Sequence, residues 1–147
     1  MYHTMADLYG VIPANDIRQL VDDEASGDSI VESESNLMYV RVLACSKKAD
    51  NLIDSYCRGR YTVPFEVVPE TIKDISVSLT IVNLYERRID LNESEVVKSR
   101  YKNAVQILEH IQDGRMRLFD DIRGPANYRT NKKKTDRVFT KDRLDTF

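Results

Sequence analysis

The longest periodic stretch of the sequence runs from about Ser33 to Arg58 and limits the possible folds more than any other feature. It contains no glycine and no proline. At about 100° per residue its apolar side chains fall on one stripe, formed by Met38, Val42, Cys45, Ala49, Leu52, Ile53 and Tyr56. This spacing predicts an amphipathic helix of about seven turns, whose apolar side other elements must cover. Tyr39, Val40 and Leu43 lie off the stripe and predict a second apolar neighbour for its first half.

The segment from Glu70 to about Arg88 fits two structures. Between positions 75 and 81 its apolar residues alternate with a period of two, as in a strand. The same segment also carries a helical stripe, and the preceding Pro69 suits the start of a helix. Because the run has no internal turn residue and is longer than most strands, we predict a central helix with both faces largely covered. A strand remains the alternative.

A third long helix is expected from Asn92 to about Asp113. The sequence Asn92-Glu-Ser-Glu95 has the form of a capping box, and Gly114 stands in the C-cap position. One wide face gathers apolar residues at helical spacing: Val96, Val97, Tyr101, Ala104, Val105, Ile107, Leu108 and Ile111. The pattern therefore predicts a helix that packs on the other two.

Two short helices are expected before these three. Thr4–Asp7 resembles a capping box, and residues 15–21 follow Pro13 with apolar positions at helical spacing. The polar segment Asp22–Asp28 is predicted to be a surface loop, with a weak calcium site as the alternative because its acidic residues loosely follow EF-hand spacing. Together these elements predict the all-α fold class: a small bundle of three long helices plus short N-terminal helices, ending in an extended C-terminal arm.

The formal net charge of −2 hides an asymmetry along the chain. Residues 123–147 contain eight basic and three acidic residues (8 − 3 = +5), so residues 1–122 carry 14 − 21 = −7. The +5 segment is poor in apolar residues and contains Gly124-Pro125. We therefore divide the chain into a helical bundle domain, 1–122, and a basic extended or disordered arm, 123–147.

Other features of the composition exclude several classes of protein. No apolar run approaches the ~20 residues that a membrane span needs, so we expect no membrane partner. Cys45 and Cys57 cannot form a disulfide framework, which favours a reducing cytoplasm. Twelve positions apart on one helix, they are also too distant to bond each other.

The sequence offers little that suits catalysis. His3 lies at the chain start and His110 on the polar side of its helix, and both are expected to be solvated or packed side chains; no metal-binding or nucleophile motif occurs. Cys45 is expected in the core, whereas Cys57 lies outside the stripe, where a reactive thiol is an open alternative. We therefore expect no enzyme, no catalytic residue, no metal and no cofactor.

Basic residues gather near the expected helix ends. Arg58, Arg87 and Arg88 are expected to interact with helix C-termini and nearby carboxylates. Arg60 is expected to brace the extended connection after Gly59 against the bundle. Leu118 and Phe119 are expected to pack on the bundle before the arm leaves it.

Several motifs resemble a known family. The loop residues Tyr56, Gly59, Arg60, Tyr61 and Pro64 form the pattern Tyr-x-x-Gly-Arg-Tyr-x-x-Pro. Together with Val68-Pro69, Leu84-Tyr85-x-Arg87-Arg88, Arg100-Tyr101-x-x-Ala104 and the segment Arg137–Leu144, this pattern resembles the Mu-like prophage protein family encoded in phage head–tail gene modules. A related loop, helix count and size occur in head–tail connector (adaptor) proteins of tailed phages.

The resemblance implies a structural protein of the virion neck. Its implied partners are further copies of itself in a ring and portal or tail-completion proteins, and its implied location is the virion or the host bacterial cytoplasm. Apolar and basic residues of the arm are the expected partner-binding residues: Arg137, Val138, Phe139, Leu144 and Phe147. The alternative is a prophage-encoded DNA-binding or host-interaction module that uses Lys132–Lys134. We disfavour nucleic acid because that tract has no interleaved aromatic residues and the rest of the chain is acidic.

Overall fold

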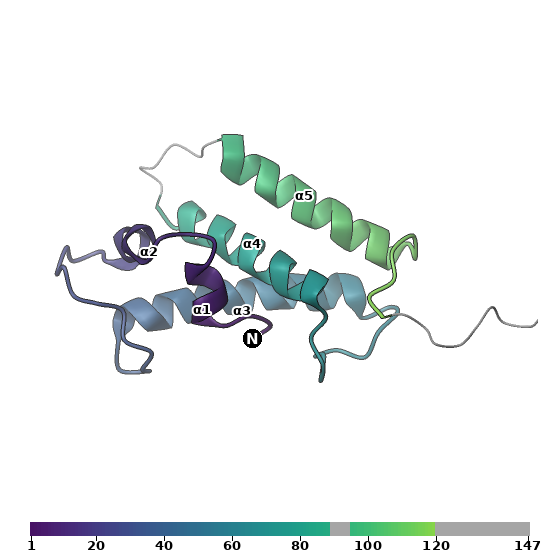
Figure 1. Ribbon diagram of the computed structural model, residues 1–147, viewed down its shortest axis with the longest axis horizontal. Coiled ribbons are helices and arrows are strands. Elements are labelled where there is room, and N and C mark those ends of the chain that lie inside the picture. The colour runs from purple at the N-terminus through teal and green to yellow at the C-terminus, as the bar shows by residue number, and fades with distance from the viewer. Residues whose placement is uncertain (89–94, 120–147) are drawn as a thin grey trace, which may run out of the picture.

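The computed structural model describes residues 1–88 and 95–119. These residues form five helices and no strand. The helices are α1 (Met5–Tyr9), α2 (Ala14–Val21), α3 (Leu37–Cys57), α4 (Glu70–Glu86) and α5 (Glu95–Gln112). Helix α4 packs against both α3 and α5, and the two short helices cover one end of the α3–α4 pair (Figure 1). The predicted all-α bundle of three long helices plus short N-terminal helices is confirmed.

Helix α4 is the central element. Residues all around it are buried: Ile72, Ile75, Ser76, Val77, Leu79, Thr80, Ile81, Val82 and Leu84. The strand alternative for this segment is therefore wrong. A helix that is covered on both sides carries apolar residues at most positions. Its apolar residues therefore fit the two-residue period of a strand as well as the 3.6-residue period of a helix.

Helix α3 begins at Leu37 rather than near Ser33. The side chain of Asn36 accepts a hydrogen bond from the backbone N–H of Tyr39 at 3.1 Å and so fixes the N-terminus there. The predicted stripe faces the bundle, with Leu52 and Tyr56 half-buried. Off the stripe, Tyr39 packs on the core but Val40 stays 39% exposed. The predicted second apolar neighbour of this half of the helix therefore covers Tyr39 but leaves Val40 exposed.

Helix α5 buries a narrower face than its sequence predicts. Val97, Ala104, Leu108 and Ile111 are buried, whereas Val96 and Tyr101 are 67% and 43% exposed. The main contacts of α5 among the described helices are with α3 and α4, and these two helices cover one side of it. At its other end Gly114 adopts φ +80°, which agrees with the predicted helix end. Of the predicted Asn92–Glu95 capping box, residues 92–94 lie outside the described residues.

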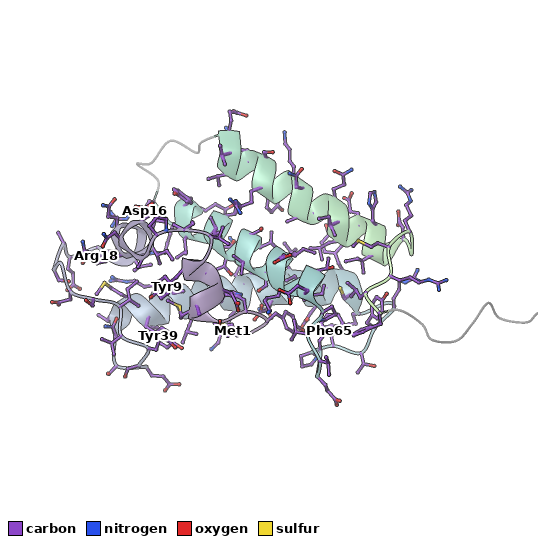
Figure 2. All side chains as sticks on the ribbon, viewed as in Figure 1. Met1, Tyr9, Asp16, Arg18, Tyr39 and Phe65 are labelled. Atoms are coloured by element: carbon purple, nitrogen blue, oxygen red, sulfur yellow. The ribbon has the colours of Figure 1, made fainter. Side chains whose placement is uncertain are left out.

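The core consists of two apolar clusters. The first core cluster joins α1 and α2 to the first half of α3 and the second half of α4. The second core cluster joins the other halves of α3 and α4 to α5. Figure 2 labels Tyr9 and Tyr39 at the end of the first cluster and Phe65 at the end of the second. Antiparallel pairing of α3 with α4 brings these halves together.

A polar seam of buried His3, Ser46, Ser76 and Thr80 lies among these apolar residues. The Ser76 hydroxyl donates to Asp50 Oδ1 at 2.9 Å, so it accepts from Nδ1 of His3 at 2.8 Å. Ser46 donates to the Val42 carbonyl oxygen at 3.1 Å. Burial lowers the pKa of His3, since taking the ring out of water disfavours its charged form. Of the two expected states of His3, solvated or packed, the structure shows the packed one.

Candidate interaction surfaces

The loop after α3 carries the most specific sequence motif. Tyr56, on the last turn of α3, is half-buried against the second core cluster. Gly59 and Pro64 are exposed, and Pro64 follows a cis peptide bond. Tyr61 is half-buried, and its hydroxyl accepts a hydrogen bond from the backbone N–H of Leu118 at 3.2 Å. The motif therefore ties the end of α3 to the segment that follows α5.

Arg60 lies against Gly114 at the end of α5. A Cβ atom added to Gly114 would stand 1.8 Å from Nη1 of Arg60, so only glycine leaves room for this guanidinium. The positive φ of Gly114 adds a second reason for glycine there. Arg60 of the loop therefore contacts the turn after α5, and its bracing role stays a prediction.

Four aromatic rings gather at this end of the molecule: those of Tyr2, Tyr61, Phe65 and Phe119. Phe65 lies centrally, with ring centroids 5.6 Å from Tyr2, 6.1 Å from Tyr61 and 6.3 Å from Phe119. The Tyr2 hydroxyl donates to Asp54 and accepts from the backbone N–H of Phe65 at 3.3 Å. Burial, followed by the bond to Asp54, raises the pKa of Tyr2. We call these four residues the aromatic cluster.

The described residues end at the aromatic cluster. Phe119 is the last described residue, and it contacts Tyr61 with a centroid distance of 6.0 Å. Leu118 packs on the second core cluster, as predicted. The five predicted partner-binding residues of the arm lie outside the described residues: Arg137, Val138, Phe139, Leu144 and Phe147. The partner-binding role of these residues therefore stays a prediction.

The opposite end of the bundle is organised by Asp23. Arg87 donates to its carboxylate, at 3.1 Å for the bond from Nη1 to Oδ2, and Arg41 Nη2 lies 3.3 Å from Oδ2. Arg88 donates from Nη2 to the backbone carbonyl oxygen of Asp22 at 2.9 Å and also to that of Gln19. These contacts match the prediction for Arg87 and Arg88, because one meets a carboxylate and the other the C-terminus of α2.

The segment that follows α2 carries most of the excess negative charge of the bundle. Residues 22–36, which we call the acidic segment, contain six acidic residues and no basic one. Four of the six are exposed and make no ion pair with the described residues: Glu24, Asp28, Glu32 and Glu34. Two apolar residues beside them, Val31 and Leu37, are 58% and 61% exposed. The segment therefore presents carboxylates and apolar side chains to solvent together.

Asp22 stabilises the turn at the start of the acidic segment. Its carboxylate accepts hydrogen bonds from the backbone N–H groups of Ser26 and Gly27, each at 3.0 Å, which lowers the pKa of Asp22. No group of three or more His, Cys, Asp or Glu side chains is placed to hold a metal ion within residues 1–88 and 95–119. The predicted surface loop is confirmed, with the carboxylate of Asp22 used to shape the turn.

Both thiols are buried in the core and free. Cys57 is fully buried in the second core cluster, and burial raises its pKa to about 11. The reactive-thiol alternative for Cys57 is therefore wrong. The sequence indicates that Cys57 faces the core, because it stands four residues after the buried Ile53 and so lies on the same side of the helix.

These features define a small helical-bundle protein with an acidic segment at one end and the aromatic cluster at the other. A family model described as Bacteriophage Mu, Gp36 matches residues 2–136, nearly the whole chain. The chain therefore belongs to the bacteriophage Mu Gp36 family and is a phage-encoded protein, which confirms the resemblance drawn from its motifs. No curated protein sequence matches it. Among the described residues, no helix is long and apolar enough to cross a membrane.

Proposed function

We propose that this protein is a head–tail connector (neck) subunit that forms a ring in the virion through contacts between copies and with portal or tail-completion proteins. Membership of a phage family supports a role in the phage particle. The observation that carries the proposal is the separation of charge along the bundle. The acidic segment precedes α3, whereas Phe119, the last described residue before the +5 segment, contacts Tyr61 just beyond the other end of that helix.

Segments of opposite charge on one subunit favour head-to-tail assembly of its copies. Helix α3 has 21 residues and is about 31 Å long, so the start of the arm and the acidic segment are separated by roughly this distance. When the arm of one copy binds the acidic end of the next, the contact is heterologous and repeats around a ring if the rotation closes. Opposite charges on the two surfaces steer this association and fix its direction.

The experiment that tests this proposal removes the arm. Deletion of residues 124–147 is expected to leave the helical melt unchanged, because both core clusters lie before this segment. It is expected to abolish ring and virion assembly, measured by sedimentation and by complementation of a phage that lacks the gene. A matched variant, Lys132, Lys133 and Lys134 each to Gln, keeps the length of the arm and lowers its charge. Assembly that proceeds unchanged without the arm contradicts the proposal.

A DNA-binding or host-interaction role is the second candidate, and Lys132–Lys134 is the feature that favours it. Lysines that neutralise phosphates release counterions, so such binding weakens steeply as salt rises. A gel-shift titration with duplex DNA at two salt concentrations separates the candidates. The connector proposal expects no shift at physiological salt, and a salt-dependent shift lost in the triple Gln variant supports DNA binding instead.

A further inference from the structure

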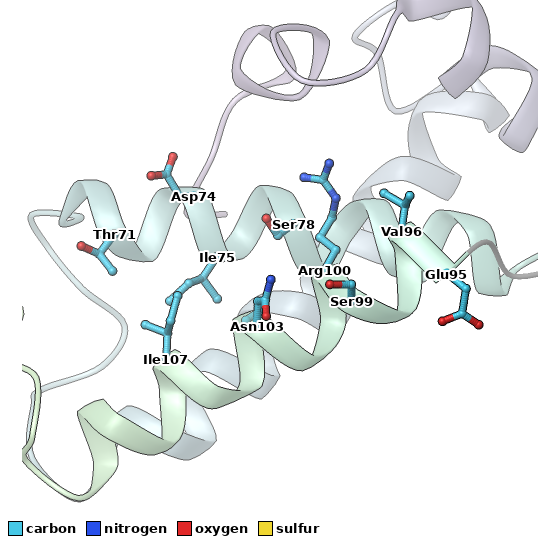
Figure 3. A pocket seen from close by; sticks show the side chains of 11 residues that line it. Thr71, Asp74, Ile75, Ser78, Glu95, Val96, Ser99, Arg100, Asn103 and Ile107 are labelled. Atoms are coloured by element: carbon cyan, nitrogen blue, oxygen red, sulfur yellow. The ribbon is translucent and has the colours of Figure 1, made fainter.

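An open groove of about 640 Å³ runs between α4 and α5 (Figure 3). Ile75 of α4 and Ile107 of α5 point toward each other across it, and Ala104 also lines it. Val96, 67% exposed, stands on the α5 side toward the start of that helix. Ile75 and Ala104 are themselves buried and form the floor of the groove. Half-buried Ile107 and exposed Val96 are therefore the apolar side chains that the groove presents to solvent.

Two charged side chains on this groove have no partner of opposite charge in residues 1–88 and 95–119. Arg100 of α5 is half-buried, and Asp74 of α4 is exposed. Neither makes an ion pair or a side-chain hydrogen bond with the described residues. Both also line a second hollow, between α4 and α1, that adjoins the groove along Ser78. A ligand that suits this surface therefore combines apolar groups with one acidic and one basic group.

The arm contains a segment with this composition. Residues 137–144 read Arg-Val-Phe-Thr-Lys-Asp-Arg-Leu, so the apolar Val138, Phe139 and Leu144 flank the adjacent charges of Asp142 and Arg143. The chain continues for 28 residues after Phe119. Residues 120–137 can span up to roughly 60 Å at about 3.3 Å per residue, about twice the length of α3. The segment can thus reach a groove on an adjacent copy.

We propose that the α4–α5 groove binds residues 137–144 of a neighbouring copy, with Asp142 on Arg100 and Arg143 on Asp74. This inference rests on the proposed function, because it locates the contact that joins subunits in the ring. The basic tract Lys132–Lys134 precedes the docked segment and lies free to meet the acidic segment of the same neighbour. Apolar contacts hold the segment, while the two ion pairs set its direction and register.

Charge reversal in the full-length protein tests the contact. Arg100→Asp alone and Asp142→Arg alone each place like charges together, and each is expected to weaken self-association at least about tenfold by sedimentation velocity. An equimolar mixture of the two variants restores assembly. In alternating copies, the native Asp142 of one variant meets the native Arg100 of the other, and the introduced arginine meets the introduced aspartate. Lys102→Asp, at an exposed position of α5 outside the groove, is the control and is expected to assemble normally.

The outcomes separate the two proposals. Rescue by the mixture supports the groove contact between copies. Rescue only when both changes are in one chain means that the arm binds its own groove, and this overturns the inference, as does failure of both forms of rescue while the native protein assembles. If the native chain does not assemble at all, the connector proposal itself fails. If Arg100→Asp does not fold, judged by its melt, the pair Asp74→Arg and Arg143→Asp provides the same test.

Discussion

Different contacts stabilise the two ends of this bundle. Beside the first core cluster, Arg41, Arg87 and Arg88 form ion pairs and hydrogen bonds with Asp23 and the C-terminus of α2. Beside the second core cluster, the rings of the aromatic cluster pack around Phe65. Ion pairs near the surface weaken as salt screens them, whereas ring packing depends on apolar burial and does not.

The two ends therefore differ in what they leave exposed. At one end the rings and the Tyr61–Leu118 hydrogen bond fasten the segment after α5 to the loop after α3. At the other end the arginines neutralise Asp23, while four carboxylates of the acidic segment stay exposed.

The largest effect is expected from loss of the central ring of the aromatic cluster. Phe65→Ala removes three ring contacts from a half-buried position and is expected to lower the free energy of unfolding by about 2–3 kcal/mol. Urea titration followed by circular dichroism measures it, with little change between low and high salt. Val67→Ala in the same loop is the control, because Val67 is 74% exposed and should cost under ~0.5 kcal/mol. Equal losses in the two variants would contradict the role given to Phe65.

A smaller effect is expected at the turn that receives Arg60. Gly114→Ala forces a side chain into φ +80° and pushes the Arg60 guanidinium away, at a cost of about 1–2 kcal/mol. Gly59→Ala is the matched control, since a Cβ there meets no atom within 4 Å and its φ lies outside the left-handed region. Thermal melts of both variants against the native chain make the comparison. A stable Gly114→Ala protein would show that the Arg60 contact is dispensable.

The polar seam between the two halves should respond to pH. The pKa of His3 is lowered in the folded protein, so the unfolded chain binds its proton first as pH falls. The contribution of neutral His3 is thus complete above about 6.5 and is lost below it, at no more than about 1.4 kcal/mol per pH unit. Melting temperatures at pH 7.5 and 5.5 measure this loss. Asp7 and Asp22, whose pKa values are also lowered, act only at more acidic pH.

The control for this measurement is His3→Gln, which cannot take up a proton near neutral pH. Its stability should change less between pH 7.5 and 5.5 than that of the native protein, whatever its absolute value. An identical pH dependence in both proteins would rule out His3 as its source.

The smallest effect is expected at the ion-pair end. Asp23→Asn keeps the shape of the side chain and removes its charge, and the Asp23 side chain is 40% exposed, so the loss should stay below about 1 kcal/mol. The loss should shrink further in 1 M salt, in contrast to the salt-insensitive loss at Phe65. Glu24→Gln, one residue away and without an ion pair among the described residues, is the control. A salt-independent loss at Asp23 would mean that both halves are held by the same kind of contact.

Much of the architecture was predictable because the signals were local. The stripe of α3, the Thr4–Asp7 capping box and the glycine after α5 each depend on residues within a few turns of one another. The capping box is present, with Thr4 N–H donating to Asp7 at 2.7 Å. The interaction surfaces were predictable in part, since the motif residues of the loop after α3 do meet the segment before the arm.

The sequence by itself determined the helical class, the approximate positions of the long helices and the split of charge between residues 1–122 and 123–147. Only the tertiary structure decided that His3 enters the core to meet Ser76, that Arg60 covers Gly114 and that Asp23 receives Arg87 from 64 residues away. The physical reason is that helix periodicity and capping act between near neighbours. Burial and charge pairing, by contrast, depend on which helix faces meet once the chain has packed.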